Sequence, residues 1–585
     1  SIHALTIFAG FADEPEDRIV IPSLAANLFS PDLSGSLTHF YTTMSFGQFS
    51  LTGTVLPHRF DFSEPTSFYA SPGSQGEYGR YVREVLVRVD SEVDFGQYDN
   101  DGPDGIPNSG DDDGIVDYIF VLLKSVPYGF IKEGATGIAG LGFQEFQTKD
   151  HTPDGSPIMI SGVMSRGSLG GIGNFAQTVG VMAHEFGHAF GLPDLYDMVY
   201  QTPEEDSAGI GAWGLMGWGA HGWTRKDGPV GFCAWSLEKL GWVGIDNKRL
   251  VEVLKPGDRL IDDLFEGGYI FKIFLPPRLH LISQSNKEQE IKAEPGYLLL
   301  EHRRRNAHYY NHHLPGEGVL VWHVQPSKVG NAFEENKLVD LVCADGLYEY
   351  EGDERRRAPL NGRDDLDCWA HDTDYAIAHN GNWGDAGDLF DGVERTELSL
   401  HSNPGISSVG DFSVEAVTPL SLRMQRQGTG MKVEIDPPRW AGEIQEEVHW
   451  AGVVIMDGDV QVKPSGSLIL YWGTEIRVAS EDRLHRGIDP EQSELLVQGG
   501  MAMGRSFGRN RDPIVFQEIE TGESWYGLII DPQVTAVIKI PDGALELQGA
   551  SAGLVIAGVV SGDGGLRLRG LQLDDTPQGA RAGNG

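Results

Sequence analysis

The chain has 585 residues, with 85 Asp or Glu against 45 Lys or Arg, and therefore a formal charge of −40. A surface this acidic repels nucleic acid and anionic membranes, and no apolar run reaches the ~18 residues that a membrane span requires. The length allows several domains. The start of the chain lacks a basic leader, so we expect a secreted or extracellular protein whose signal and propeptide are absent from this chain.

The region 1–245 is expected to form a first domain that mixes strands and helices. Residues 4–11 and 115–123 are apolar enough for core strands. Residues 78–89 have apolar side chains at helical spacing and basic residues on the polar face. This pattern predicts an α/β unit.

Aspartates crowd among glycines in the run YDNDGPDGIPNSGDDDGIVD, and six of the seven are candidate ligands: Asp99, Asp101, Asp104, Asp111, Asp113 and Asp117. Carboxylates this close repel one another unless a hard cation neutralises them, and calcium takes about six to eight oxygen ligands. The spacing is not that of an EF-hand. We therefore predict a structural calcium site, with a flexible acidic turn as the alternative.

The segment HEFGHAFGLPD, from His184 to Asp194, follows a run with apolar residues at helical spacing. In a helix, His184 and His188 lie one turn apart on the same face and can share one metal ion. Gly191 suits a left-handed helix end, and Pro193 prevents further helix. The turn can therefore return Asp194 to the metal as a third ligand.

Two histidines and a carboxylate predict a catalytic zinc ion. Three protein ligands leave a fourth position for water, whose pKa zinc lowers to about 7. Glu185 is placed to take the proton of this water as it attacks a carbonyl carbon, and to pass it to the leaving amine. The predicted reaction is hydrolysis of a peptide bond.

Alternatives exist for the third ligand. Asp197 is a nearby rival of Asp194. In a thermolysin-like arrangement the third ligand would instead be a distant glutamate, such as Glu204, Glu205 or Glu238.

The helix is followed by a glycine-rich turn, GIGAWGLMGWGAHGW, from Gly209 to Trp223. Met216 in this turn resembles the Met-turn residue that metzincin zinc peptidases place beneath their histidine ligands, and plain core packing is the alternative. Trp218, His221 and Trp223 are candidates for lining a specificity pocket.

These segments resemble the immune inhibitor A-type metallopeptidases, a secreted metzincin-like family. The resemblance extends to FYTTMSFGQFSLTGTVLP at 40–57, to AWSLEKLGW at 234–242 and to the DNDG and DDGIVD runs of the acidic loop. It implies zinc bound by His184, His188 and Asp194, with Glu185 as general base and Met216 as the Met-turn residue. Many metzincins have a tyrosine two residues after this Met, whereas this chain has tryptophan.

Residues 246–437 are expected to form a second domain. The short β patterns at 296–305 and 316–324 resemble the β-sandwich that follows the catalytic domain in some family members. A loop-rich insertion at 331–393 holds four aspartates that bind a second calcium ion or form a solvated loop: Asp340, Asp345, Asp385 and Asp388. Five histidines here match no ligand spacing and are interpreted as structural: His302, His308, His312, His313 and His323.

In residues 438–585 short apolar strands recur around glycine and proline. This sequence pattern resembles the coils of a right-handed parallel β-helix, with a second small sandwich as the alternative. Trp450, Trp472 and Trp525 are expected to be exposed on this β surface, where they would either bind a polysaccharide or another surface polymer or simply cap the stack.

The sequence thus predicts a multidomain α+β protein: a metzincin-like α/β catalytic domain, a β-sandwich and a C-terminal β-rich domain. The leading functional hypothesis is a secreted zinc endopeptidase acting on proteins or peptides, with one catalytic zinc ion and structural calcium. The alternative is a surface- or polymer-binding β-rich protein with a vestigial peptidase domain.

Overall fold

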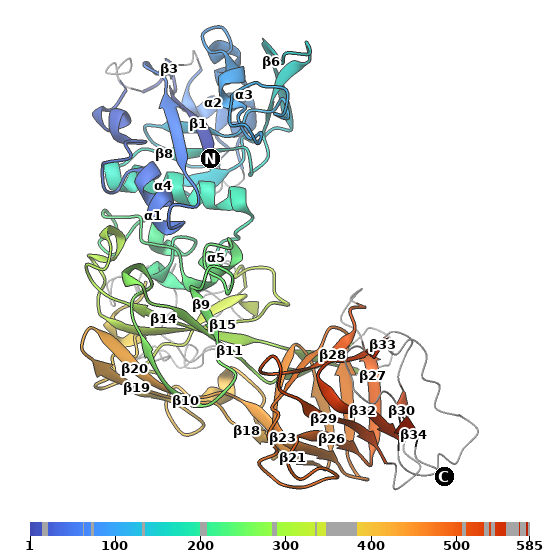
Figure 1. The fold of residues 1–585 in the computed structure, drawn as a ribbon. Helices are drawn as coiled ribbons and strands as arrows, with labels where there is room; N and C mark the ends of the chain where they lie inside the picture. The colour runs from blue at the N-terminus through green and yellow to red at the C-terminus, as the bar shows by residue number, and fades with distance from the viewer. Residues whose placement is uncertain are drawn as a thin grey trace.

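The computed structural model describes residues 1–14, 21–61, 64–71, 75–131, 135–198, 207–283, 289–333, 336–346, 383–505, 511–531, 538–539, 544–556, 572–573 and 581–582. Figure 1 shows an N-terminal region at one end, a β-rich middle region, and a C-terminal region of stacked strands beside the latter. Among the described residues, no helix combines the length and the apolar character needed to cross a membrane.

A six-stranded sheet organises the N-terminal region, with strand order β2-β1-β4-β8-β5 and β3 also paired to β1. The strands are β1 (Ile2–Gly10), β2 (Leu51–Val55), β3 (Phe60–Asp61), β4 (Ile119–Leu123), β5 (Gly137–Ala139) and β8 (Gly167–Gly171). All pairs are parallel except β5 with β8, so β5 is an antiparallel edge strand. Both faces of the central strands are buried, which explains why β1 and β4 read as continuous apolar runs.

Helices cover both faces of this sheet: α1 (Leu37–Met44) and α4 (Phe175–Gly187) on one face, and α3 (Tyr78–Val89) with the short α2 (Thr66–Tyr69) on the other. Helix α5 (Ala234–Lys239) instead contacts strands of the middle region. Phe8 and Phe120 point into a core that contains α1 and α4, whereas Ile7 and Val121 point into a core that contains α3. This alternation is the period of two that a strand imposes. The predicted strand at 4–11 and helix at 78–89 are confirmed, and the strand predicted at 115–123 begins later, at Ile119.

Two sheets form the middle region. One has the order β16-β15-β14-β11-β9 and the other β10-β20-β19-β17. Their strands are β9 (Leu250–Glu252), β10 (Gly257–Ile261), β11 (Ile270–Phe274), β14 (Tyr297–Arg303), β15 (Gly318–Val324), β16 (Val339–Leu341), β17 (Glu397–Leu398), β19 (Ser421–Gln427) and β20 (Gly430–Asp436). Apolar residues of both sheets meet in one core. Two separate hairpins pair β6 (Glu145–His151) with β7 (Pro157–Ser161), and β12 (Arg278–Ser283) with β13 (Gln289–Glu294).

The core beneath α4 continues into the middle region. Trp213 and Met216 belong to the same hydrophobic cluster as Trp322 on β15 and Leu341 on β16. The N-terminal and middle regions are therefore packed against each other through shared apolar burial, across the boundary predicted near residue 245.

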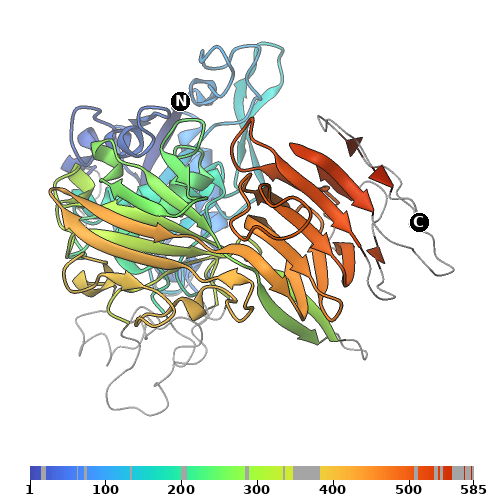
Figure 2. The same cartoon turned by 60° about the horizontal axis from the view of Figure 1, so that its bottom comes forward.

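The C-terminal region is built from parallel pairs. Its larger sheet has the order β33-β31-β28-β25-β23-β26-β29-β32-β34, with β21 also on β23, and a smaller sheet has the order β22-β24-β27-β30. The only antiparallel pair within these two sheets, among the residues described, joins β18 to β21. This nearly closed parallel arrangement fits a β-helix-like fold, and Figure 2 shows the strands running side by side.

The strands of this region are β18 (Val417–Thr418), β21 (Arg439–Ile444), β22 (Glu447–Trp450), β23 (Val453–Val462), β24 (Ser467–Tyr471), β25 (Glu475–Val478), β26 (Glu494–Val497), β27 (Gly500–Arg505), β28 (Ile514–Glu518), β29 (Trp525–Ile530), β30 (Ile538–Lys539), β31 (Leu545–Leu547), β32 (Ala550–Ile556), β33 (Gln572–Leu573) and β34 (Arg581–Ala582). Trp450 and Trp525 are fully buried in their core, and Trp472 is half-buried. The expectation that Trp450 and Trp525 are exposed is wrong, because burial in the coil interior gives their rings more apolar contact than the surface offers.

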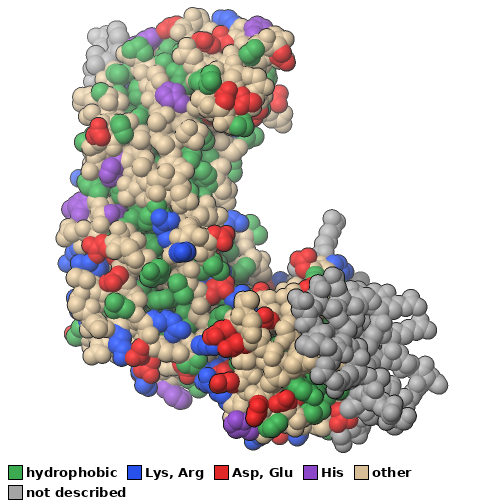
Figure 3. Space-filling view, viewed as in Figure 1, with side chains coloured by type: hydrophobic (Ala, Val, Ile, Leu, Met, Phe, Trp, Pro, Cys, Tyr) green, Lys and Arg blue, Asp and Glu red, His purple; other side chains and the backbone are tan. Residues whose placement is uncertain are grey.

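Charge is distributed unevenly on the face drawn in Figure 3. Asp and Glu side chains gather at the far end of the N-terminal region, whereas Lys and Arg side chains gather over the middle region.

Candidate metal centre

Helix α4 carries the two histidines. Asn174 caps it through a capping box with Gln177, which satisfies free backbone N–H groups of the first turn. After α4, His188 starts a short 3-10 turn that ends at Gly191, with a left-handed φ of 78° as the sequence predicted. The chain then reverses direction and brings Asp194 back toward the helix.

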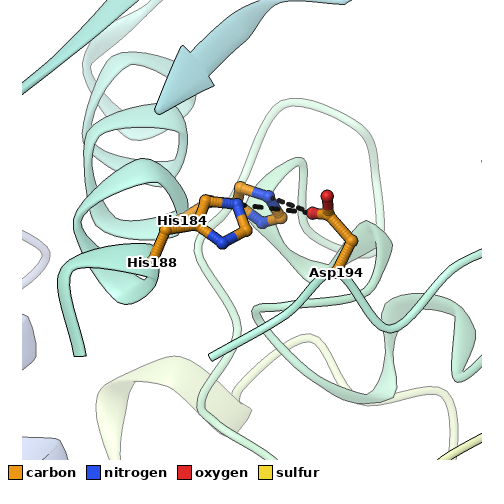
Figure 4. A group of neighbouring side chains, drawn as sticks. All are labelled: His184, His188 and Asp194. Atoms are coloured by element: carbon orange, nitrogen blue, oxygen red, sulfur yellow. Dashed lines mark hydrogen bonds and ion pairs between the residues drawn. The ribbon is translucent and has the colours of Figure 1, made fainter. Parts of the chain in front are cut away.

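Both imidazoles point at one carboxylate oxygen (Figure 4). His184 Nε2 lies 3.0 Å and His188 Nε2 lies 3.4 Å from Asp194 Oδ1. Ligand atoms of these three residues all lie within 4.8 Å of one another. The donor set of two imidazole nitrogens and one carboxylate oxygen fits zinc.

The other nitrogen of each ring is held by a backbone carbonyl. His184 Nδ1 lies 2.9 Å from Leu215 O, and His188 Nδ1 lies 2.8 Å from Leu192 O. Since a carbonyl only accepts, each Nδ1 carries a proton, so Nε2 is the nitrogen of each ring that faces the possible metal position. The surrounding turns thus orient the rings for metal binding.

The charges of these groups depend on one another. Burial lowers the pKa of His184, but the hydrogen bond and charge of Asp194 outweigh it and raise this pKa to about 9. Burial opposes ionisation of Asp194, yet both histidines hold its pKa far below the usual range. A cation at this position therefore has a carboxylate partner already charged.

Glu185 lies in the same cavity but outside the ligand group. Burial raises its pKa to about 6, against the lowering effect of the neighbouring His184 and His188. A cavity of about 370 Å³ brings its carboxylate together with the histidines, Asp194 and the edge strand β5. A Cβ on Gly137 of β5 would lie 2.4 Å from Glu185 Oε1, so only glycine leaves room for this carboxylate.

The far wall of the cavity comes from the glycine-rich turn. Trp218 and His221 line it, as the sequence suggested. Trp223 is not among the lining residues and packs instead against Trp213, with ring centroids 4.7 Å apart. Met216 lies under α4: a Cβ on Gly187 would approach its Sδ to 2.6 Å.

The alternative candidates for the third ligand do not join His184 and His188 among the described residues. Asp197 is buried, and the group of possible ligands contains Asp194 instead. Glu238 lies on α5 and binds Lys272 Nζ at 2.7 Å and the Tyr297 hydroxyl at 2.9 Å. Glu204 and Glu205 lie outside the described residues.

The acidic loop brings three of the six candidate aspartates together. Asp99, Asp101 and Asp113 have carboxylate oxygens within 4.8 Å of one another. Arg166 supplies a positive charge to this loop: its guanidinium lies 2.7 Å from Asp113, 3.3 Å from Asp101 and 3.5 Å from Asp117. The crowding that suggested calcium is thus at least partly neutralised by an arginine, and calcium gains no support from these contacts.

The other predicted acidic and histidine positions do not assemble into a metal site among the described residues. Asp104 and Asp111 are exposed, and Asp111 Oδ2 accepts from Asp104 N at 3.1 Å. In the insertion, Asp340 pairs with Lys337 at 2.7 Å and Asp388 binds Trp213. Within the described part of the chain, the five histidines of the middle region join neither group of possible metal ligands.

Sequence reasoning missed Gly137 and Arg166. It named Asp388 only as a possible calcium ligand or part of a solvated loop, whereas this residue is buried and accepts a hydrogen bond from Trp213. Each of the three acts through a neighbour far away in the chain. The glycine and the arginine could have been found only by knowing which strand or loop lies opposite.

Comparison with known proteins agrees with this geometry. Residues 25–240 match the immune inhibitor A peptidase M6 catalytic domain. The chain is 26% identical over 225 residues to the pre-pro-metalloprotease PrtV of Vibrio cholerae serotype O1 (strain M66-2), covering 35% of this chain and 23% of that protein. It is 27% identical over 206 residues to immune inhibitor A of Bacillus thuringiensis subsp. alesti, covering 30% of this chain and 27% of that protein.

The match thus spans about a quarter of the length of these relatives. Residues 25–240 of this chain are therefore similar to the catalytic domain of the immune inhibitor A (M6) metallopeptidases.

Proposed function

We propose that this protein is a secreted, zinc-dependent endopeptidase. The observation that carries the proposal is the convergence of His184, His188 and Asp194 on one point of a cavity that also holds the Glu185 carboxylate. The match to the M6 catalytic domain supports it, and the relatives named as a metalloprotease and as immune inhibitor A suggest protein substrates.

The residues divide the chemistry between them. When bound, zinc supplies a Lewis acid for the substrate carbonyl and lowers the pKa of a water molecule. Glu185 accepts the proton of the attacking water and returns it to the leaving nitrogen. Its pKa of about 6, raised by burial, suits this exchange because the carboxylate is a stronger base than an exposed glutamate and is still ionised near neutral pH.

The edge strand β5 offers a place for a peptide. Ile138 and Ala139 line the cavity, and β5 has a hydrogen-bonded neighbour on one side only among the described strands. An extended peptide can add to such an edge through main-chain hydrogen bonds, which places a scissile bond across the cavity. This explains why a protein, rather than a small molecule, is the expected substrate.

The architecture in finer detail is part of the proposal. We assign residues 1–245 to the catalytic domain, 246–437 to a β-sandwich and 438–585 to a right-handed parallel β-helix. The alternative, a polymer-binding protein with a vestigial peptidase, has lost its main support because Trp450 and Trp525 are buried. Structural calcium at the acidic loop stays a prediction from the sequence.

Two substitutions separate metal binding from proton transfer. Glu185→Gln should keep one zinc ion per chain while cleavage of a casein-like substrate falls by about 100-fold or more. Asp194→Ala should weaken zinc binding itself. Glu145→Gln, on the exposed hairpin, is the matched control and should behave like the unaltered chain. Undiminished cleavage by the Glu185→Gln variant would refute the proposed mechanism.

A further inference from the structure

The turn that carries Met216 touches the metal centre at three points. Leu215 O holds His184 Nδ1 at 2.9 Å, and Met216 O accepts from Leu195 N, next to Asp194, at 2.8 Å. The thioether of Met216 supports α4 at Gly187. A displacement of this turn would therefore rotate the His184 ring and move the loop that carries Asp194.

The opposite side of the turn is held by a short segment of the middle region. Trp213 Nε1 donates to Asp388 Oδ2 at 2.5 Å, and Ala212 N donates to Trp383 O at 2.7 Å. The Trp383 ring stacks on Trp218, with centroids 4.8 Å apart and planes 13° apart. Three contacts from residues 383–388 thus hold the turn on the side opposite the candidate metal centre.

Burial and hydrogen bonds restrict the position of the Asp388 side chain. It is fully buried, and its Oδ2 also accepts from Asp385 N at 2.9 Å. A Cβ on Gly384 would lie 2.6 Å from Trp213 Nε1, and φ at this glycine is +104°. A buried carboxylate is costly unless it is hydrogen-bonded, and an indole N–H can only donate, so the pair has one strongly preferred geometry.

These contacts cross from the matched catalytic region to a segment beyond it, because Trp213 lies within 25–240 and Asp388 does not. We propose that Asp388 is a positioning residue of the metal centre: by holding Trp213 it fixes the turn of Leu215 and Met216, and so the orientation of His184 and the loop of Asp194. This inference rests on the proposed zinc site. It makes the middle region a structural part of the active site.

The test uses the full chain loaded with zinc and measures the rate of zinc loss to an excess of chelator, together with kcat and KM on a peptide substrate. Asp388→Ala should release zinc about 10-fold faster or more, the scale on which supporting residues tune metal sites. kcat should fall more than KM rises, since the substitution leaves β5, the strand on which the peptide is proposed to bind, unchanged. Asp388→Asn keeps an acceptor oxygen and should recover part of the loss.

Trp213→Phe removes the N–H but keeps a ring, and should act like Asp388→Ala. The double variant should be no worse than either single one, because both remove the same hydrogen bond. If Asp388→Ala does not fold, Asp388→Asn and Trp213→Phe carry the test. Asp391→Asn, in the next bend and bonded to Arg395, is the control and should leave zinc loss unchanged.

Zinc loss at the unaltered rate in Asp388→Asn and Trp213→Phe, with only thermal stability reduced, would overturn the inference. The outcome is separable from that of the proposed function. If the chain has no peptidase activity but its rate of zinc loss still depends on Asp388, the endopeptidase is refuted and the positioning role is supported. If the chain is active and its rate of zinc loss does not depend on Asp388, the positioning role is refuted and the endopeptidase is supported.

Discussion

Gly187 offers a direct test of how the candidate metal centre is packed. Gly187→Ala should destabilise the chain when Met216 is present and stabilise it when the Met216 side chain is removed. A Cβ there would lie 2.6 Å from Met216 Sδ and 3.3 Å from Met216 Cε. In a helix, alanine is favoured over glycine by about 0.5–1 kcal/mol. Forcing an extra carbon into a filled core costs about 1–3 kcal/mol, so Gly187→Ala should destabilise the chain by about 1–2 kcal/mol.

The same change should stabilise a chain that lacks the thioether. Met216→Ala removes Sδ and Cε, and with them the clash, at its own cost of about 2–5 kcal/mol. In that background Gly187→Ala should recover about 0.5–1 kcal/mol of helix propensity. The double-mutant cycle isolates the contact between these two residues.

The assay is urea unfolding of the four chains without zinc, followed by the rate of zinc loss from the folded forms. Gly244→Ala is the control, because a Cβ there meets no atom within 4 Å. An equal destabilisation by Gly187→Ala in both backgrounds would show that Met216 does not press on α4, and the Met-turn interpretation would fail.

Three further results are expected. Gly137→Ala should push the Glu185 carboxylate aside and reduce cleavage about 10- to 100-fold with zinc retained, whereas loss of zinc in this variant would contradict the account. Chelation should abolish cleavage and added zinc should restore it, with the sheet structure unchanged by circular dichroism, because the core beneath α4 is apolar. In the C-terminal region, burial raises the pKa of Asp459 to about 8, and Asp482 and Glu494 add to this shift. The folded chain then holds this proton more tightly than the unfolded chain, so stability falls as pH rises from about 4 to 8. Asp459→Asn should therefore raise Tm at pH 8 and change it little at pH 4, with exposed Glu481→Gln as control. An equal shift at both pH values would contradict the assignment.

The clustering of His184, His188 and Asp194 could be predicted because these residues are local in the chain. His184 and His188 share a helix, and Gly191 and Pro193 determine where the chain turns back to Asp194. Strand β1 and helix α3 could also be predicted, since apolar runs and helical spacing indicate directly which residues are buried.

Residues that act across the fold could not be predicted. Whether Arg166 neutralises the aspartates of the acidic loop depends on a strand connection that no local pattern encodes. The tryptophans at 450 and 525 were expected on the surface, yet a coil of parallel strands turns them inward. The pairing of Trp213 with Asp388 joins residues 175 positions apart, so only the packing of the two regions reveals it.

Anomalous X-ray diffraction at the zinc edge, from crystals of the zinc-loaded chain, would locate the metal ion itself. One strong peak is expected about 2.0–2.2 Å from His184 Nε2, His188 Nε2 and a carboxylate oxygen of Asp194. A peak bound by Asp197 or a distant glutamate would contradict the assigned ligand set, and the absence of any peak between the two imidazoles would contradict the metallopeptidase itself.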